Sequence, residues 1–576
     1  MPGSTQPSRW HPVIAGSEAI VANPLFAYGA VVVVQLRAIW DVWRYKDFTF
    51  GDSAAYFTRA AEWANHLKDD VVWSPLYTNY WGTILAVVGD VYVAAMVHRI
   101  GIVLAAALLV LALLRRLLEP PLALVLALWW VVLPPTYDVL YEVHLFGILP
   151  VIVAALVVAR SPGRVPLGIA FAVLAGATLL LRNELAIATL VMGVAIVIHE
   201  LRAPRVDRAS LGEYVRAYGV PLAVVGLLLI GAYWRSYIQG DTARSVLRDK
   251  HNLNVCQIYA FNYQQRHPTR FLGNPFIHCR PLMEETFGRP LPSFLQATLA
   301  NPRAMADYVA WNGRLLPTGL QVSLFGATVT RDDPDYVPVE GERLYPLVLS
   351  VALVALLIAG WVVMRRDREY WRSRLTPAAW VFVVLGSVAL TTLVVVLMQR
   401  PRPEYMYGLV IAVLVAAGLC ASALVRRWSL EQLTAPAALG VVGALALGLS
   451  SHYQPGPRPL HDGVERLEAV RGLLQRPGSV LVTARDGFGL CSYLAGGQKA
   501  HCSAPSPQAL ASRVEDGRSL GDVLDAVGAT VVYDEAWLRA DPAFAPLLAA
   551  PETFGWRRVA GGTGPEGPWG VLVRDG

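Results

Sequence analysis

One acidic residue stands alone in the stretch FTFGDSAAYF, residues 48–57, which directly follows the first apolar segment of the chain. Asp52 lies there among small and apolar residues, with Tyr56 four positions later as a candidate pocket residue. A carboxylate in such surroundings can act as a general base that takes a proton from an attacking hydroxyl group. Asp is also a preferred N-cap, and taken by itself the stretch favours a cap for a helix that begins at Ser53. The rest of the chain is needed to decide between the two.

A second group of ionisable residues follows a break in the apolar sequence at residues 133–138. Glu142 is a candidate second active-site acid, which would hold an acceptor or a metal ion or act together with Asp52. The alternative is a first-turn acid that the helix dipole stabilises, and the sequence supports both equally. His144 belongs to the same group as a candidate pocket residue, and both Glu142 and His144 are expected near the water boundary.

Arginines that suit a phosphate group occur in two later turns. Arg182 and Glu184 interrupt an apolar run over residues 170–198, where ionisable groups are costly unless they face protein or water. Arg182 is a candidate phosphate ligand because its fork of donors matches a phosphate, and the alternative is an Arg–Glu pair that stabilises a turn. The turn MQRPRPEY contains three further candidate phosphate ligands, Arg400, Arg402 and Tyr405. The alternative is a turn whose side chains are merely solvated.

The composition places these residues in a membrane protein. Of 576 residues, 55% are hydrophobic and only 16% are charged, and the mean hydropathy is +0.43. These values are too apolar for an ordinary soluble domain. Residues 1–13 are polar, so no cleavable signal peptide is expected. The net charge of +6 is spread over short loops between apolar runs, which indicates membrane topology and excludes nucleic acid from the expected partners.

The pattern predicts a polytopic α-helical domain over residues 1–449, with about eleven apolar segments that can cross a membrane as helices. Arginines cluster in alternate loops, so the positive-inside rule puts those loops in the cytoplasm and Asp52 outside. Two polar segments, about 40–91 and about 235–343, are expected to be ordered external loops, the first with surface helices over 53–67 and 74–88. The predicted spans are residues 22–39, 91–114, 122–134, 145–158, 165–181, 185–198, 218–233, 344–364, 378–398, 407–424 and 435–449.

The last part of the chain, residues 450–576, is predicted to be a soluble extracytoplasmic α/β domain. Residues 479–483, 530–533 and 569–573 have the pattern of buried strands, and residues 464–474 that of an amphipathic helix. Glycines at 487 and 489 follow the first strand, but the full nucleotide-binding pattern is missing, so no nucleotide is expected.

The cysteines fit an oxidising outer compartment. Cys256 and Cys279 share the second long loop, Cys491 and Cys502 share the tail, and Cys420 falls inside a span. Neither pair has the close CxxC spacing of a zinc site, which favours two disulfides over metal binding.

Four short features of the first 200 residues belong together. They are Gly51-Asp52 with Tyr56 and Ala60, the surface helix at 74–77 followed by His98-Arg99, Tyr141-Glu142, and LRNE at 181–184. In these features the chain resembles the C-type glycosyltransferase (GT-C) superfamily, and within it the protein mannosyltransferase and lipid A aminoarabinose transferase branch. It departs from the protein mannosyltransferases at Ser53, where an acid would follow Asp52, which speaks against protein O-mannosylation.

The resemblance implies an enzyme of the bacterial inner membrane whose active site and C-terminal domain are extracytoplasmic. Asp52 is then the catalytic base, Glu142 a second active-site acid, and Arg400 or Arg402 a phosphate ligand. The donor is a polyprenyl-phosphate sugar and the acceptor a glycan, lipid or protein, while a divalent cation is left open as a cofactor. One-step displacement would invert the anomeric centre. Candidate acceptor or pocket residues are Tyr56, Arg99, His144 and Glu184.

Two other function classes remain. A flippase of polyprenyl-linked sugars would also use many spans and outward arginines, although the chain shows no internal repeat of the kind common in transporters. A non-catalytic assembly protein of the cell envelope would bind partners or glycans through its tail. Only an enzyme would change the ratio of sugar to lipid in a purified system.

Overall fold

The computed structural model describes most of the membrane helices and much of the C-terminal domain. The described residues are 11–40, 51–67, 70, 72–89, 91–133, 142–161, 163–202, 210–238, 243–271, 275–330, 342–448, 470, 472–473, 479–483, 502–503, 505, 510–511, 513–514, 517–534, 536–539, 541–564 and 567–574. The chain divides into two units, which are taken separately below. Unit 1 comprises residues 1–39, 102–138 and 143–455, and unit 2 comprises residues 40–101, 139–142 and 456–576.

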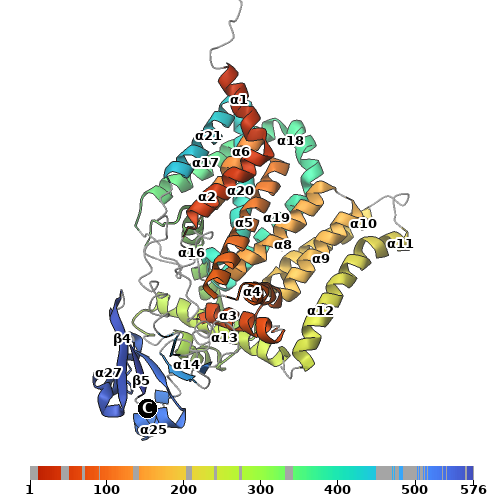
Figure 1. Ribbon diagram of the computed structural model, residues 1–576. Helices are drawn as coiled ribbons and strands as arrows, with labels where there is room; N and C mark the ends of the chain where they lie inside the picture. Colours follow the sequence, from red (N-terminus) through yellow and green to blue (C-terminus); the bar gives the residue numbers. More distant parts are fainter. Residues whose placement is uncertain are drawn as a thin grey trace, which may run out of the picture. The chain divides into compact units, whose positions relative to one another are not determined.

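Helices occupy all eleven predicted span positions (Figure 1). In the described residues eight helices are long and apolar enough to cross a membrane, or nine if a bent pair counts as one span. Two further apolar helices, α6 (Pro120–Val131) and α9 (Arg164–Leu180), are shorter. The eight lie in α5 (Val91–Leu117), α8 (Glu142–Arg160), α10 (Ala186–Arg202), α12 (Val220–Ile238), α17 (Tyr345–Arg366), α19 (Ala379–Met398), α20 (Tyr407–Arg427) and α21 (Glu431–Gly448).

The first predicted span, residues 22–39, is one helix, and a second helix that was not predicted precedes it at an angle. The chain breaks between α1 (His11–Ala22) and α2 (Pro24–Ala38), and the segments Gly16–Ala22 and Pro24–Ala38 are bent by 72°. The Asn23 side chain accepts a hydrogen bond from the backbone N–H of Leu25 at 2.9 Å. Asn is a good N-cap and Pro suits the first helical position, so the Asn-Pro pair ends one helix and starts the next.

Small residues allow the membrane helices of unit 1 to approach closely. Gly360 of α17 faces Cys420 of α20, and a Cβ atom at residue 360 would collide with that cysteine. Gly168 of α9 lies in the same way against the backbone carbonyl of Ala217. In membranes such small residues promote packing because they bring backbones together. Large apolar side chains on the outer faces of α12 and α17 remain exposed, as expected for helices that meet lipid.

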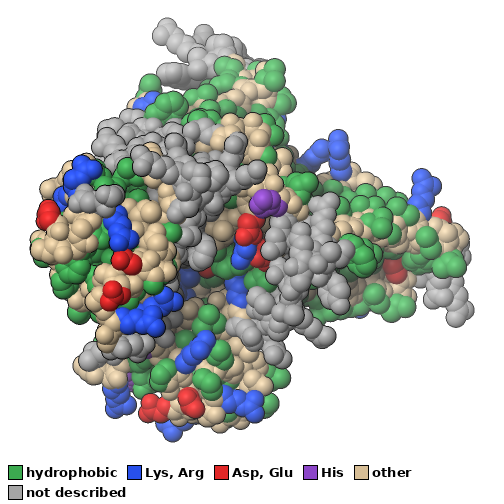
Figure 2. Space-filling view, turned by 60° about the horizontal axis from the view of Figure 1, so that its bottom comes forward, with side chains coloured by type: hydrophobic (Ala, Val, Ile, Leu, Met, Phe, Trp, Pro, Cys, Tyr) green, Lys and Arg blue, Asp and Glu red, His purple; other side chains and the backbone are tan. Residues whose placement is uncertain are grey.

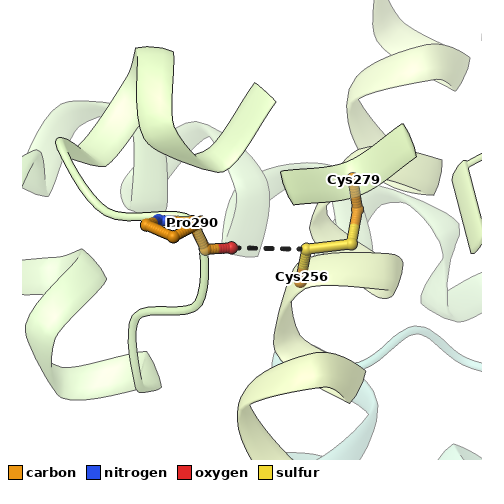
Figure 3. Close-up of a disulfide and its surroundings, with 3 residues drawn as sticks. All are labelled: Cys256, Cys279 and Pro290. Atoms are coloured by element: carbon orange, nitrogen blue, oxygen red, sulfur yellow. Dashed lines mark hydrogen bonds between the residues drawn. A yellow bond between two sulfur atoms is a disulfide. The ribbon is translucent and has the colours of Figure 1, made fainter. Parts of the chain in front are cut away.

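The second long loop is a helical subdomain of unit 1. It contains α13 (Ala243–Arg266), α14 (Pro275–Phe287), α15 (Phe294–Ala300) and α16 (Pro302–Phe325). A buried cluster that includes Tyr259, Met283 and Tyr308 forms its core. The predicted Cys256–Cys279 disulfide is confirmed and joins α13 to α14 within that core (Figure 3). The Cys256 sulfur also lies 3.8 Å from the carbonyl oxygen of Pro290. This is a van der Waals contact, because a sulfur in a disulfide carries no hydrogen to donate.

Two amphipathic helices in unit 2 follow the first span, close to their predicted ranges. They are α3 (Gly51–His66) and α4 (Pro75–Val88), which pack against each other. Gly82 of α4 permits this contact, since a Cβ atom there would lie 2.9 Å from the Cβ of Trp63 and collide with its ring. Because α3 begins at Gly51, Asp52 lies inside the first turn, and the alternative of an N-cap for a helix at Ser53 is wrong.

In its described residues, the C-terminal domain contains a five-stranded sheet in the order β2-β1-β3-β5-β4. Strands β2 (Cys502–Ser503), β1 (Ser479–Val482) and β3 (Val531–Asp534) are parallel, and β5 (Gly567–Arg574) and β4 (Trp556–Gly564) continue the sheet antiparallel. The three strands expected from the sequence are present. The core beneath them includes Val532, Leu572 and side chains of the short helices α25 (Leu520–Ala526) and α27 (Ala545–Ala549).

Two predictions for the tail cannot be followed in the structure. Cys491 and most of the expected helix at 464–474 lie outside the described residues. The Cys491–Cys502 disulfide therefore stays a prediction.

Candidate functional site

Glu142 is the centre of a buried polar cluster in unit 2. It is the first residue of α8, and its side chain is fully buried. The carboxylate accepts a hydrogen bond from Arg99 Nη1 at 3.4 Å and from the Tyr77 hydroxyl at 3.4 Å, and it lies 3.2 Å from His98 Nδ1. Arg99 and His98 are also buried. The arginine compensates the charge that burial would otherwise penalise.

Aromatic rings enclose this cluster. The Trp81 ring stacks on the His98 ring with centroids 4.3 Å apart, and Tyr77 meets the same imidazole edge to face at 5.4 Å. Tyr77 is contacted in turn by Tyr56 of α3, with centroids 5.3 Å apart. Burial and the neighbouring Glu142 raise the pKa of Tyr77 well above its usual value. The phenol therefore stays protonated and acts as a hydrogen-bond donor to the carboxylate.

Asp52 belongs to the same unit but lies in a different environment. Its side chain is exposed in the first turn of α3. Tyr56 follows four residues later, so the two side chains share one side of the helix. Tyr56 thus connects the helix face of the exposed acid to the aromatic wall around Glu142.

Unit 1 contains a small polar cleft between membrane helices. His144, Arg182, Glu184 and Tyr405 all line it, and the His144 and Tyr405 rings meet edge to face at 4.6 Å. Arg182 forms an ion pair with Glu184, which was the structural alternative expected for this turn. The cleft has a volume of about 60 Å³. One water needs roughly 10–15 Å³, so a small polar group fits here but a sugar does not.

The arginine turn, residues 399–405, runs beside this cleft. Arg402 pairs with Glu404, Nε to Oε1 at 2.5 Å, and lies over the Tyr405 ring with Cζ 5.1 Å from its centroid. Arg400 is buried with Cζ 3.8 Å from the centroid of Phe261, in cation–π geometry. Its φ of 151° lies in the region that favours glycine. Such backbone strain persists only where the surroundings hold it in place.

The loop subdomain supplies that support. The Tyr308 hydroxyl donates to the carbonyl of Met398, and Asn312 Nδ2 donates to the carbonyl of Leu397 at 2.9 Å. These groups satisfy carbonyls at the C-terminal end of α19 that have no partner within the helix. Gly319, further along α16, packs directly against Pro401. One face of α16 therefore fixes the backbone that carries Arg400 and Arg402.

Burial raises the pKa of Tyr405 in this turn, against the opposing effect of Arg402. The phenol remains a donor at neutral pH. The phenol and the guanidinium groups are all hydrogen-bond donors, so the turn suits a ligand with hydrogen-bond acceptors, such as phosphate oxygens.

The predicted site residues thus fall into two groups. The cluster in unit 2 was only partly expected, because Glu142 is buried and not at a water boundary, and because His98 and Tyr77 are among its central members. Unit 2 contains Asp52, Tyr56, Arg99 and Glu142, and unit 1 contains His144, Arg182, Glu184, Arg400, Arg402 and Tyr405.

Sequence reasoning missed the residues that position the arginine turn. Phe261, Tyr308, Asn312 and Gly319 lie in a loop for which only an ordered external domain was expected. The spacing of Tyr308, Asn312 and Gly319, four and seven residues apart, places them on one helical face and was an available signal.

Metal binding is a separate question for this site. Across the described ranges, no three His, Cys, Asp or Glu side chains come together in a way that would hold a metal ion.

Comparison with solved structures finds similar membrane enzymes. The archaeal oligosaccharyltransferase AglB from Archaeoglobus fulgidus, in complex with an inhibitory peptide and a dolichol-phosphate, is similar over 91% of this chain and 71% of its own, with a TM-score of 0.45 and 12% identity. ArnT from Cupriavidus metallidurans, bound to undecaprenyl phosphate, is similar over 95% of this chain and 97% of its own, with a TM-score of 0.39 and 12% identity. No protein-family model and no curated protein sequence matches the chain.

The support of the arginine turn can be tested at Gly319. A Cβ atom at this position would collide with the carbonyl oxygen of Pro401. We expect Gly319→Ala to lower the free energy of unfolding by about 1–3 kcal/mol, the usual cost of overpacking. Gly313→Ala on the same helix is the matched control, since its Cβ would lie 3.6 Å from Leu397 in ordinary contact. Thermal unfolding in detergent measures both, and equal effects would refute the close contact.

The Glu142 pair can be tested by a double-mutant cycle. Glu142→Gln leaves the Arg99 charge buried without its carboxylate, and we expect a loss of about 3–5 kcal/mol in unfolding free energy. Combining it with Arg99→Met should cost less than the sum of the single changes. Glu62→Gln, which removes the partly exposed ion pair to Arg59, should cost less than about 1 kcal/mol. Strict additivity of the Glu142 and Arg99 changes would contradict the pairing.

Proposed function

We propose that the chain is a membrane glycosyltransferase that moves a sugar from a polyprenyl-phosphate donor to an acceptor hydroxyl at the extracytoplasmic face. The observation that carries the proposal is an apolar groove on the lipid side of unit 1 that ends at the turn of Arg182. A ligand that fits both features has a long apolar chain and an anionic head group. A polyprenyl phosphate has that chemistry.

The groove lies between α9 and α10. It has a volume of about 560 Å³ and runs along α10 from Ala186 to Ile198, roughly 18 Å at the helical rise. Leu190, Val194 and Val197 in its wall are exposed apolar side chains. Figure 2 shows hydrophobic side chains over most of the part of the molecule that α9 to α12 build. In a bilayer this surface meets hydrocarbon, so the groove is open to a lipid chain.

The groove and the polar cleft adjoin at one turn. The helix α9 ends at Leu180 and α10 begins at Ala186, and between them a 3-10 turn, η2 (Asn183–Leu185), follows Arg182. Leu179 and Ala186 line the groove, and Arg182 and Glu184 line the cleft. A lipid chain in the groove would therefore present its phosphate at the cleft. With three arginines and two glutamates, the cleft and the arginine turn together carry a net charge of +1.

These groups suit the leaving phosphate. Charge develops on the phosphate oxygen as the bond to the sugar breaks, and donors fixed in advance stabilise it without reorganisation. The Arg–Glu pairs and the protonated Tyr405 hold their donors in place for that purpose. The cleft itself admits only a small polar group, so the sugar lies outside it.

The acceptor is activated by a base, and we assign that role to Asp52. Its exposed carboxylate is accessible to an acceptor hydroxyl, and Tyr56 ties its helix to the Glu142 cluster. Asp52 would take the hydroxyl proton while the oxygen attacks the anomeric carbon and the lipid phosphate leaves with the bonding electrons. One displacement inverts the anomeric centre. Glu142 serves as the second acid. It holds Tyr77 by a hydrogen bond, and Tyr77 in turn packs against Tyr56 on the helix of Asp52.

The disulfide in the loop subdomain supports an outward orientation. Such bonds form and persist in oxidising compartments and are rare in the cytosol. The arginine turn is attached to that subdomain, so the phosphate-binding residues share its side of the membrane. With that orientation, we propose a bacterial inner membrane as the location of the enzyme and an envelope glycan, lipid or protein as its acceptor.

The catalytic role of Asp52 is tested by Asp52→Asn. We expect transfer of label from polyprenyl-phosphate sugars to fall by at least about 10²-fold, because general-base catalysis contributes 10²–10⁴. Binding of polyprenyl phosphate should be unchanged, since the variant leaves unit 1 intact. Glu62→Gln on the same helix is the control and should transfer normally. Substantial activity of Asp52→Asn would exclude this residue as the base.

The lipid groove is tested by Ala186→Trp, which fills its end beside the cleft. Binding of a labelled polyprenyl phosphate to protein in nanodiscs should weaken at least about tenfold, and Arg182→Gln should weaken it to a similar degree because charge-assisted hydrogen bonds are lost. Leu228→Trp, on the exposed face of α12 outside the groove, is the matched control. Wild-type binding by Ala186→Trp would show that the lipid lies elsewhere.

A further inference from the structure

A buried carboxylate in the C-terminal domain lies beneath two arginines. Asp534 is the last residue of β3 and is fully buried. Arg539, from the short helix α26 (Ala536–Arg539), donates from Nε to Oδ1 and from Nη2 to Oδ2, both at 2.6 Å. Arg558 of β4 donates from Nη2 to the same Oδ2 at 2.8 Å. Two cationic groups therefore meet at one carboxylate oxygen.

One arginine is enough to satisfy this acid. The bidentate fork of Arg539 is the strongest arrangement for an Arg–carboxylate pair and neutralises Asp534 by itself. Arg558 adds a second positive charge beside the first, and like charges so close repel. The cluster has a net charge of +1. A second anion between the guanidinium groups would relieve the repulsion.

The arginines still have donors to offer. Their side chains are 31% and 38% exposed. Within the described part of the domain, Arg539 Nη1 and Arg558 Nε donate to no protein group. The buried carboxylate fixes both guanidinium groups, so little side-chain freedom is lost when a ligand binds.

The sheet is shaped to admit Arg558 at this position. Gly570 of β5 pairs with Asp534 across the sheet, and a Cβ atom at residue 570 would collide with Arg558 Nη1. The cluster also lies at the carboxyl end of β3, which is parallel to β1. Ligands of open α/β sheets bind at that edge.

We propose that Arg539 and Arg558 form an oxyanion site that binds the phosphate or carboxylate group of an acidic glycan. The choice of a glycan as the carrier rests on the proposed glycosyltransferase function, whereas the oxyanion chemistry rests on this cluster alone. The site lies in the C-terminal domain and takes no part in the chemistry at Asp52. The site would hold an acidic acceptor glycan, or a glycan that is being extended, through the negative charge that recurs along the glycan.

The test uses the full-length protein in nanodiscs, titrated with inorganic phosphate and separately with glucuronate by isothermal calorimetry. We expect binding of at least one probe, and the probe that binds more tightly identifies the group. Arg558→Lys keeps a cation for Asp534 but removes the spare fork, and should weaken binding about tenfold. Arg574→Lys is the matched control, since Arg574 forms an exposed pair with Asp525 on the same domain.

A second variant separates binding from folding. Gly570→Ala retains both charges but displaces Arg558, and should weaken binding to the same extent while the domain stays folded by circular dichroism. Asp52→Asn should abolish transfer and leave probe binding intact, so failure of the enzymatic proposal is distinguishable from failure of this one. No binding by the wild type, or an equal loss in Arg574→Lys, would overturn the oxyanion site.

Discussion

A charge that leaves water must meet an opposite charge, and the polar parts of this protein are built around that constraint. Glu142 is buried with Arg99, Asp534 with Arg539 and Arg558. At the ends of the membrane helices the partners are close in sequence, since Arg182 and Arg402 each pair with a glutamate two residues later. Each pair fixes a guanidinium group that would otherwise sample many rotamers. The protein obtains oriented donors from residues that also make burial tolerable.

In the proposed enzyme, the partial neutralisation of Arg182 and Arg402 by their glutamates determines which anions the phosphate site accepts. Fully exposed arginines would bind any anion from solution, whereas arginines already engaged by a carboxylate discriminate by geometry. The adjoining apolar groove adds a second requirement, because only an amphiphile occupies both. In the proposed enzyme, specificity for a lipid phosphate follows from this combination and needs no single strong contact.

Much of the helical architecture was predictable because it depends on local composition. Long apolar runs punctuated by arginines mark the membrane helices, and helices stand at every predicted position. The bend at Asn23-Pro24 and strand β4, which contains three glycines, were not recovered, because a turn signal beside an apolar run and a glycine-rich strand both depend on their neighbours. Arg182 and Glu184 were recognised together, since two residues so close in sequence pair locally. Tyr308 and Asn312 were missed because their partners lie about 90 and 85 positions away.

The attachment of the arginine turn to the disulfide-linked subdomain has a consequence for biogenesis. The turn connects two membrane helices, yet its backbone is fixed by α16 and its Arg400 by a ring of α13. Insertion of the spans alone therefore does not complete this part of the protein. In the proposed enzyme, the arginine turn acquires its final geometry only after the loop helices have folded and Cys256 and Cys279 have been oxidised, so maturation would be tied to the compartment in which the donor lipid is used.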